Sequence, residues 1–401
     1  MLDVRIAMPP PDTSRHICEV ARPDNFTHPR GRRRYLRQLA VSAALMISLA
    51  VAAQPCWSQD TSRTTDAVFT NPGARSIALG GAFAAIADDA TAAFANPAGL
   101  VQILRPELSV ELRGTASRTD HSSPYDLANS VSGLGFFSFV YPSPSWAVAL
   151  YSHQLASLGF TIVDPFTLRR DFSVRSYAAA AAFEIGEHLS LGAGLSYFDG
   201  DRSPAAGVRG VSDTDWGLTA GVLWNPSLAW RVAGFYRQGP EFESTMDSNK
   251  RTLSPVRIHH TKAFADAARF TFPDEYGVGV AFKPKAGALT LSVEWDRVGS
   301  SVDPLHNGHL VTEAGSEYHL GAEYAVLRWK PVVAFRTGFW RESGRRHDVI
   351  ADFVEEESFY SEGQTHMAFG FGLAFKRFQI DAGVDIWSKS VVGSVSFIFS
   401  F

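Results

Sequence analysis

Residues 289 to 296 read Leu-Thr-Leu-Ser-Val-Glu-Trp-Asp, with large apolar side chains at the odd positions and polar or charged ones at the even positions. Successive side chains of a β-strand point to opposite faces, so this period of two predicts a strand with one apolar face. The same alternation recurs from 189 to 197, from 215 to 224 and from 378 to 386. The chain is therefore predicted to be all-β.

Fourteen stretches of about 11 to 14 residues carry the pattern, which is longer than the usual strand of a soluble sheet and matches a tilted membrane crossing. They are 106–118, 132–142, 145–156, 172–185, 188–200, 212–225, 228–238, 273–284, 287–298, 316–327, 330–342, 364–376, 377–388 and 390–401. The connections between them alternate in length. Long ones at 119–131, 157–171, 201–211, 239–272, 299–315 and 343–363 are separated by turns of a few residues, and a short hairpin near Lys389 breaks the rule.

An even number of strands, with short turns at one rim and long loops at the other, is the arrangement of outer-membrane barrels. A soluble sandwich shows the same alternation within a strand but has no reason to alternate its loop lengths. We therefore predict a 14-stranded antiparallel transmembrane barrel over residues 104–401, with the short turns and both termini on the periplasmic side. The eight tryptophans within the predicted barrel lie mostly at strand ends, where their rings favour the headgroup level of a membrane. They are Trp146, Trp216, Trp224, Trp230, Trp295, Trp329, Trp340 and Trp387.

Residues 1–58 are predicted to be an extension and a cleaved export signal. Five arginines between Arg30 and Arg37 precede the uncharged apolar run from Leu39 to Ala53, and small residues follow it. A short buried helix or membrane anchor is the alternative interpretation. The Gln-Pro pair before Cys56 does not fit a lipid-attachment cysteine, so a lipoprotein is disfavoured.

Composition excludes several classes of protein. The only cysteines are Cys18 and Cys56, which rules out a disulfide framework and a Cys-based metal site. Removal of residues 1–59 leaves 29 basic against 37 acidic residues, a net charge of −8, so nucleic-acid binding is not expected. The segment after Asp60 has no stretch of 18 apolar residues, which excludes a helical membrane protein. These features indicate export to the outer membrane of a Gram-negative cell.

The segment before the first strand, residues 59–103, is rich in Ala and Gly and does not alternate. Asp88 or Asp89 is expected to cap a short helix, and Asn96-Pro97 to end it. Fourteen strands enclose more space than wall side chains fill, so we predict that this part-helical segment is a plug inside the barrel.

The stretch from Gly73 to Leu100 resembles the N-terminal hatch of the FadL-type outer-membrane transporters of long-chain fatty acids and aromatic hydrocarbons, and equally that of their PorV-type relatives. The resemblance rests on Leu79-Gly80-Gly81-Ala82, on Ala87-Asp88-Asp89-Ala90 and on Asn96-Pro97-Ala98. It implies that these residues close the lumen, and that a hydrophobic substrate enters from outside and leaves sideways through the wall.

Two regions are candidates for ligand binding. The second half of the 239–272 loop combines Phe264 and Phe270 with Arg257 and Lys262, so it can form an amphipathic element with cations for a carboxylate. A solvated lid with ordinary charges is the alternative. Arg336, flanked by aromatic side chains, is the candidate for an anionic head group inside the barrel.

Twelve titratable residues fall on the face predicted to point inward, where buried charges need partners, so most are expected to pair with one another or with the plug. They are Glu107, Glu111, Arg113, Arg175, Asp215, Glu294, His319, Glu323, Arg336, His366, Asp381 and Asp385. The alternating last strand ends in Phe397, Phe399 and Phe401, which resembles the C-terminal signal that outer-membrane barrels present to their assembly machinery.

No catalytic or phosphate-binding motif occurs, so the chain is predicted to be neither an enzyme nor a cofactor-binding or metal-binding protein. Three functions stay open. The first is passive uptake of hydrophobic compounds across the outer-membrane lipid. The second is a PorV-type accessory barrel that serves as shuttle or anchor for a secreted protein, which the short 201–211 loop favours. The third is an ordinary diffusion channel, against which the plug argues.

Overall fold

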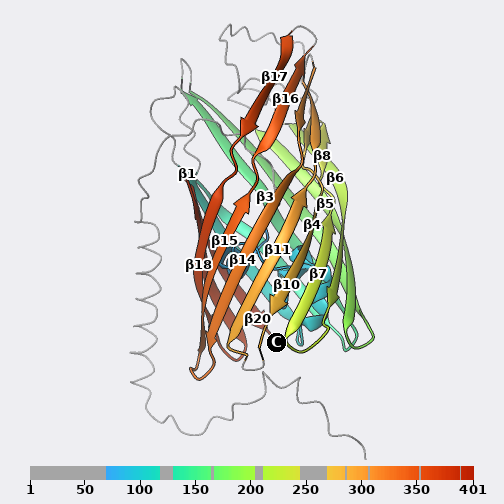
Figure 1. Ribbon diagram of the computed structural model, residues 1–401, viewed down its shortest axis with the longest axis vertical. Coiled ribbons are helices and arrows are strands. Elements are labelled where there is room, and N and C mark those ends of the chain that lie inside the picture. Colours follow the sequence, from blue (N-terminus) through green and yellow to red (C-terminus); the bar gives the residue numbers. More distant parts are fainter. Residues whose placement is uncertain are drawn as a thin grey trace, which may run out of the picture. The chain divides into compact units, whose positions relative to one another are not determined.

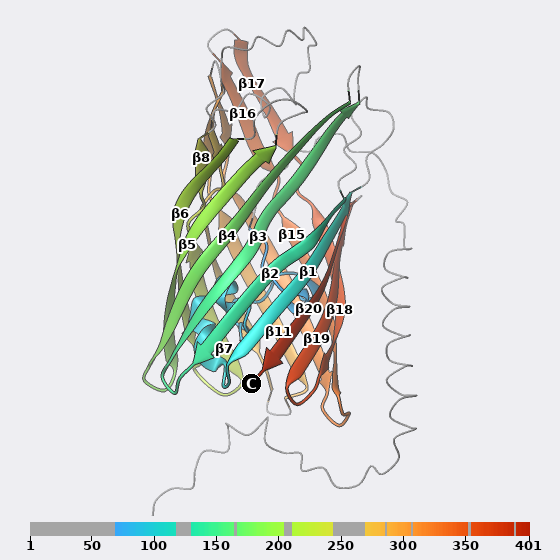
Figure 2. The ribbon, with the colours of Figure 1, turned by 180° about the vertical axis from the view of Figure 1, so that it is seen from behind.

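The computed structural model describes residues 69–117, 130–163, 167–203, 211–243, 269–284, 287–305, 308–351, 354–388 and 390–401. In this part of the chain, fourteen strands form one closed antiparallel barrel, as predicted. Figures 1 and 2 show the tilted strands of the wall from opposite sides, with a small helical segment enclosed by them. No helix among the described residues is long and apolar enough to cross a membrane.

The strands follow one another around the wall in chain order. They are β1 (Glu107–Ser117), β2 (Ser130–Pro142), β3 (Trp146–Val163), β4 (Thr167–Ile185), β5 (Leu189–Ser203), β6 (Val211–Trp224), β7 (Trp230–Arg237), β10 (Glu275–Phe282), β11 (Leu289–Val298), β14 (Gly315–Val326), β15 (Val332–Glu342), β18 (Thr365–Ala374), β19 (Phe378–Trp387) and β20 (Ser390–Ser400). The barrel closes where β1 pairs with β20 along its whole length, from Glu107 opposite Ser400 to Ser117 opposite Ser390. Closure leaves no exposed sheet edge at this point.

The wall is apolar outside and polar inside. In β11, Leu291 and Val293 are exposed on the outer face, whereas Ser292, Glu294 and Asp296 are buried toward the lumen. All twelve titratable residues predicted to face inward are buried or half-buried. This is the reverse of a soluble sandwich and is the pattern of a wall whose outer face meets lipid.

Several strands continue beyond the rim, where long loops were predicted. A four-stranded sheet is built from β12 (Ser301–Leu305), β13 (Gly308–Thr312), β16 (Arg345–Ala351) and β17 (Val354–Ser361), and a smaller one from β8 (Glu241–Glu243) and β9 (Arg269–Thr271). Figure 1 shows β16 and β17 at the end opposite Phe401. The loop prediction was wrong for most of 157–171, 299–315 and 343–363. Above the lipid a strand needs no apolar face, so its alternation is lost while its backbone pairing continues.

The hatch, here residues 69–103, lies inside the barrel as predicted. It contains α2 (Ala74–Ala78), α3 (Ala92–Ala95) and the 3₁₀ helix η2 (Pro97–Gln102), and Figure 2 shows these short helices behind β2, β3 and β4. Helix α3 ends at Ala95 just before Asn96-Pro97, as expected. The predicted export signal, with its cleavage point near Gln59, lies outside the described residues.

Two of the eight tryptophans do not belong to an outer belt. Trp146, Trp216, Trp224, Trp230 and Trp329 are exposed, and Trp295 is half-buried. Trp340 and Trp387 instead stack on either side of His366, with ring centroids 3.6 and 4.7 Å from the imidazole. Both Trp340 and Trp387 lie at inward positions of their strands. A position near a strand end does not by itself show whether a side chain faces the lipid or the lumen.

Candidate transport site

Glycines on the inner face of the wall allow the hatch backbone to lie directly against it. A Cβ atom at Gly192 of β5 would lie 2.3 Å from the amide nitrogen of Ala98, and one at Gly338 of β15 would lie 2.1 Å from that of Gly80. Real Cβ contacts are never this short. The hatch is therefore fitted to the wall on two separate sides of the barrel.

The Asn96-Pro97-Ala98 turn is fixed by the Asn96 side chain. Its amide nitrogen donates to the carbonyl oxygens of Ala84 (3.1 Å) and Val222 (3.2 Å), and its amide oxygen accepts from the amide of Ala98 at 3.1 Å. Asn96 thereby caps η2, which has Pro97 as its first residue, and joins two parts of the hatch to β6.

The Gly80-Gly81 pair forms a tight turn beside β14. Both residues have left-handed backbones, with φ of +62° and +81°, which glycine adopts without steric cost. The carbonyl oxygen of Gly80 accepts a hydrogen bond from Nδ1 of His319 at 2.7 Å, and that of Gly81 accepts one from the Asn71 side chain at 3.2 Å. The turn is thus bonded to the wall and to the start of the hatch.

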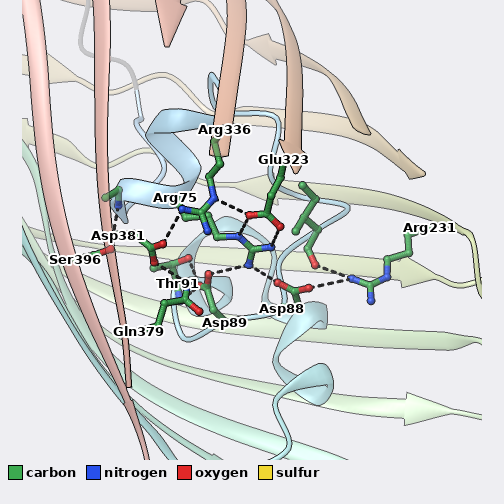
Figure 3. A network of polar contacts seen from close by, with 12 residues as sticks. Arg75, Asp88, Asp89, Thr91, Arg231, Glu323, Arg336, Gln379, Asp381 and Ser396 are labelled. Carbon is green, nitrogen blue, oxygen red and sulfur yellow. Dashed lines mark hydrogen bonds and ion pairs between the residues drawn. The ribbon is translucent and has the colours of Figure 1, made fainter. Parts of the chain in front are cut away.

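Arg75 of α2 is the centre of a polar network that joins the hatch to the wall (Figure 3). Its guanidinium contacts both carboxylate oxygens of Glu323 of β14, at 2.9 and 3.1 Å. It also contacts Asp88 at 2.5 Å and Asp89 at 3.4 Å within the hatch. Bidentate pairing of Arg with a carboxylate fixes orientation as well as charge. No sequence motif singles out Arg75.

Arg336 of β15 extends this network along the wall instead of facing an open lumen. Its guanidinium contacts Glu323 at 2.6 Å and Asp381 of β19 at 2.6 Å, and the side chain of Gln379 donates to Asp381 at 2.7 Å. The inward position was predicted correctly. Arg336 is buried and paired with two wall carboxylates, of which Glu323 also holds Arg75 of the hatch, and its role as a head-group ligand stays a prediction.

The two hatch carboxylates differ in their electrostatics. Burial favours the neutral form of both, but the guanidiniums of Arg75 and Arg231, with Lys283, outweigh burial at Asp88 and lower its pKa. Burial raises the pKa of Asp89 despite Arg75 and its hydrogen bonds from Thr91. Asp89 accepts from the amide (2.9 Å) and the hydroxyl (2.5 Å) of Thr91. Asp89 therefore stabilises the turn before α3. The prediction that it caps the helix was wrong, because α3 has no side-chain cap.

Arg237 of β7 anchors the opposite side of the hatch. It forms a buried pair with Glu275 of β10 at 2.9 Å and donates to Asn71 (2.8 Å) and to the carbonyl oxygen of Ala95 (2.8 Å). Its guanidinium also lies 4.7 Å from the ring centroid of Phe94. The hatch is therefore held by separate ionic clusters at β7 and at β14–β19.

The pairing between β2 and β3 ends well before β3 does. Their pairing runs from Pro142 opposite Ala147 up to Phe136 opposite His153 and then stops, although β3 continues to Val163 paired with β4 on its other side. Residues 130–134 of β2 remain paired only with β1, and Gly135 is paired with neither strand. We call this unpaired interval, residues 130–135 of β2 and 154–163 of β3, the β2–β3 seam.

Irregular backbone marks the foot of the seam. The β1–β2 register shifts between Glu111 and Leu112, which leaves Gly135 as an extra residue, and the β3–β4 register shifts at Leu155. Bulges bend a strand and end its pairing. A small open pocket of about 360 Å³ lies here, lined by Leu112, Arg113, Gly114 and Gly133.

One side chain crosses the seam from β4 to β2. Arg175 donates to the carbonyl oxygen of Leu134 at 3.2 Å and also contacts the side chains of Gln154 and Ser152. Because Leu134 lies in the unpaired part of β2, this contact supplies one of the hydrogen bonds that a β3 ladder would otherwise provide.

Aromatic rings cluster just below the seam. Phe94 of the hatch packs edge-on to His153 at 4.5 Å, and Phe136 lies 5.8 Å from both His153 and Tyr151, measured between ring centroids. All four side chains are buried, and neither ring nitrogen of His153 has a hydrogen-bond partner. The hatch, β2 and β3 thus meet in an apolar cluster at the level where the wall comes apart.

Other predicted residues fall elsewhere. Arg257, Lys262 and Phe264 lie outside the described residues, and of Phe270 the structure describes the backbone in β9, paired with Phe242. Phe397, Phe399 and Phe401 are exposed at the end of β20, which agrees with lipid-facing positions and leaves their role in assembly a prediction.

No protein-family model and no curated protein matches the sequence. Solved structures do match the fold. A FadL homologue of Pseudomonas aeruginosa aligns with a TM-score of 0.59 and 13% identity over 84% of this chain and 100% of that one. The toluene transporter TodX of Pseudomonas putida gives 0.59 and 12% over 84% and 100%. The toluene transporter TbuX of Ralstonia pickettii gives 0.58 and 14% over 84% and 99%. The resemblance seen in the sequence is thereby confirmed at the level of structure, and the chain has the fold of the FadL-type transporters.

Proposed function

We propose that this protein resides in the outer membrane and takes up small hydrophobic molecules, such as fatty acids or aromatic hydrocarbons, which leave the barrel sideways through the β2–β3 seam. The observation that carries the proposal is the loss of β2–β3 pairing above Phe136 and His153, directly above a hatch that is bonded to the wall.

The hatch makes a straight route through the barrel unfavourable. Its backbone lies against wall glycines, and its charges are paired with wall residues on two sides. A solute that enters from the long-loop side meets this floor. The free energy of an apolar solute falls when it moves into the acyl chains that surround the wall, by about 25 cal/mol per Å² of apolar surface removed from water.

The surroundings of the seam suit such a solute. Leu112 and Leu134 are exposed on the outer face beside it, and the aromatic cluster of Phe94, Phe136 and Tyr151 lies at its foot. Two of the proteins with this fold are toluene transporters by name, which supports a hydrophobic cargo for this chain as well.

A bulky residue in the seam tests the route. Gly133 pairs with the inward-facing Arg113, and a Cβ there meets nothing within 4 Å, so Gly133→Phe is expected to fold and to obstruct the seam. Gly393 of β20 also has open space around its Cβ, and Gly393→Phe serves as the control. We expect Gly133→Phe to slow uptake of labelled toluene and oleate into cells by about tenfold, which corresponds to about 1.4 kcal/mol of barrier.

Equal uptake by both variants would refute the lateral route. Mass spectrometry of organic extracts from the protein purified in mild detergent identifies the cargo. An empty barrel that copurifies with a secreted protein would favour the PorV-type accessory role instead.

A further inference from the structure

We propose that Asp296 of β11 and Glu317 and His319 of β14 form a binding site for a divalent transition-metal ion, such as Zn²⁺, between the barrel wall and the Gly80-Gly81 turn of the hatch. Each of the three side chains offers one ligand atom, and these atoms all lie within 4.8 Å of one another. Asp296 and Glu317 are opposite each other in the β11–β14 ladder, and His319 follows two residues along.

The histidine is oriented as metal-binding histidines usually are. Nδ1 of His319 lies 2.7 Å from the carbonyl oxygen of Gly80, and because a carbonyl accepts only, Nδ1 carries the proton. In the neutral ring Nε2 then has its lone pair directed at Asp296 (3.2 Å) and Glu317 (3.5 Å). A backbone carbonyl that fixes the other ring nitrogen is the common outer-shell arrangement of histidine ligands.

Three buried carboxylate oxygens in the cluster accept no hydrogen bond, and one of them, Oε1 of Glu317, has only a long ion pair with Arg345 at 3.8 Å. Oδ1 of Asp296, Oε1 of Glu317 and Oε1 of Glu294 accept no hydrogen bond, although all three residues are at least nine-tenths buried. Glu294 stands opposite His319 in the ladder, and its other oxygen accepts from the amide of Ala84 at 2.7 Å. Burying an ionised oxygen without a partner is costly, and a cation is the partner that this donor set fits.

Acidic side chains outnumber basic ones around the cluster. Glu275, Glu294, Asp296 and Glu317 lie together with two guanidiniums, those of Arg237 and Arg345.

The mixture of one imidazole and carboxylates suits zinc and its neighbours rather than calcium or magnesium, which prefer oxygen ligands alone. Because Nδ1 of His319 donates to Gly80 of the hatch, an ion on Nε2 would hold the ring in the orientation that links the wall to the hatch. The competing explanation is an imidazolium that pairs directly with Asp296 and Glu317.

The experiment compares the full-length protein with Asp296→Asn, Glu317→Gln and His319→Gln variants, each purified from outer membranes and also refolded with ZnCl₂ or CoCl₂. The matched control is His366→Gln, since His366 is another buried lumenal histidine paired with a carboxylate, Asp385 at 3.0 Å. Folding is verified by the retention of compact mobility in unheated SDS gels.

We expect one Zn²⁺ per wild-type barrel by elemental analysis and visible absorption bands from bound Co²⁺. The control should retain both. In each of the three ligand variants, the affinity for the metal should fall by more than the roughly 10- to 100-fold that loss of an outer-shell partner costs. Folded wild-type barrel without metal under all conditions, or equal metal in His319→Gln, would overturn the proposal and leave His319 as an imidazolium in an ion pair. Neither result would affect the seam, which is tested separately by uptake.

Discussion

The hatch contact at β14–β19 and the β2–β3 seam are two parts of one wall that are held together in opposite ways. At β14–β19 the backbone ladder is continuous, and Arg75, Glu323, Arg336 and Asp381 add a buried chain of ion pairs. At the seam the ladder stops, and the side chain of Arg175 reaches across. The difference indicates that the hatch is held firmly to the wall at β14–β19, whereas the wall has fewer contacts between its own strands at the β2–β3 seam.

The largest effect should come from Arg75→Ala. It removes the positive charge between Glu323, Asp88 and Asp89 and leaves buried carboxylates uncompensated, which costs about 3–5 kcal/mol when a buried pair is broken. The barrel ladder does not involve Arg75, so the wall should stay folded while the hatch loosens. Planar-bilayer recordings should then show ion conductance where the wild type shows little.

The control is Arg346→Ala, because Arg346 pairs with Asp348 at 2.8 Å and donates to Ser358 at 3.1 Å within the sheet beyond the rim. Unchanged low conductance in Arg75→Ala would mean that the ionic network does not hold the hatch. The hatch contact at β14–β19 would then not differ from the seam in the way proposed.

Weakening the seam should have a smaller effect than Arg75→Ala, and it should change the uptake of substrate rather than the ion conductance. Arg175→Met keeps the apolar stem but removes the hydrogen bond to the carbonyl oxygen of Leu134, which for a charged donor contributes about 1.5–3 kcal/mol. If release through the seam limits transport, uptake of a hydrophobic substrate should rise several-fold without added ion conductance.

Arg297→Met is the matched variant, since Arg297 also bonds across two strands, to Ser316 at 3.1 Å, but in a continuous ladder. An equal gain in both variants, or a loss of uptake in Arg175→Met, would show that the crossing contact at the seam does not restrain release.

The sequence predicts the two regions unequally. Alternation placed the barrel strands within a few residues because lipid requires apolar side chains on one face of every crossing strand. It also placed Glu323 and Arg336 inward. It did not show their partners, since pairing with Arg75 depends on how the hatch seats against the wall. Nor did it show the seam, because Ser130 to Gly135 alternate acceptably whether or not β3 pairs with them. Gly133 and Gly135 are a weak signal of a bulge.

The Asp296–Glu317–His319 cluster was missed for a related reason. These residues belong to two strands, and their approach is set by the β11–β14 register, which places Asp296 opposite Glu317. Single-strand patterns predict which face a side chain occupies but not which residue of the next strand it meets. The sequence therefore yields inward charge, while the cluster and its hatch partner Gly80 follow from the fold.

The smallest effect should be a dependence of hatch stability on pH. Asp89 has a raised pKa in the folded hatch, so its ionised form is disfavoured there, and acidification through that pKa should relieve the penalty and stabilise the hatch. Asp88 has a lowered pKa. The stability that Asp88 contributes is therefore present above the ordinary pKa of an aspartate and is lost only as pH falls through the lower pKa of the folded state. Hydrogen exchange of hatch peptides, corrected for intrinsic rates, should thus show greatest protection in mild acid and a decline at lower pH.

Two variants separate the contributions of these carboxylates. Asp89→Asn should abolish the gain in mild acid while keeping the decline at lower pH. Asp88→Asn should loosen the hatch already at neutral pH because it weakens the pair with Arg75. A gain that persists in Asp89→Asn would place its origin outside the hatch, in the carboxylates of the wall.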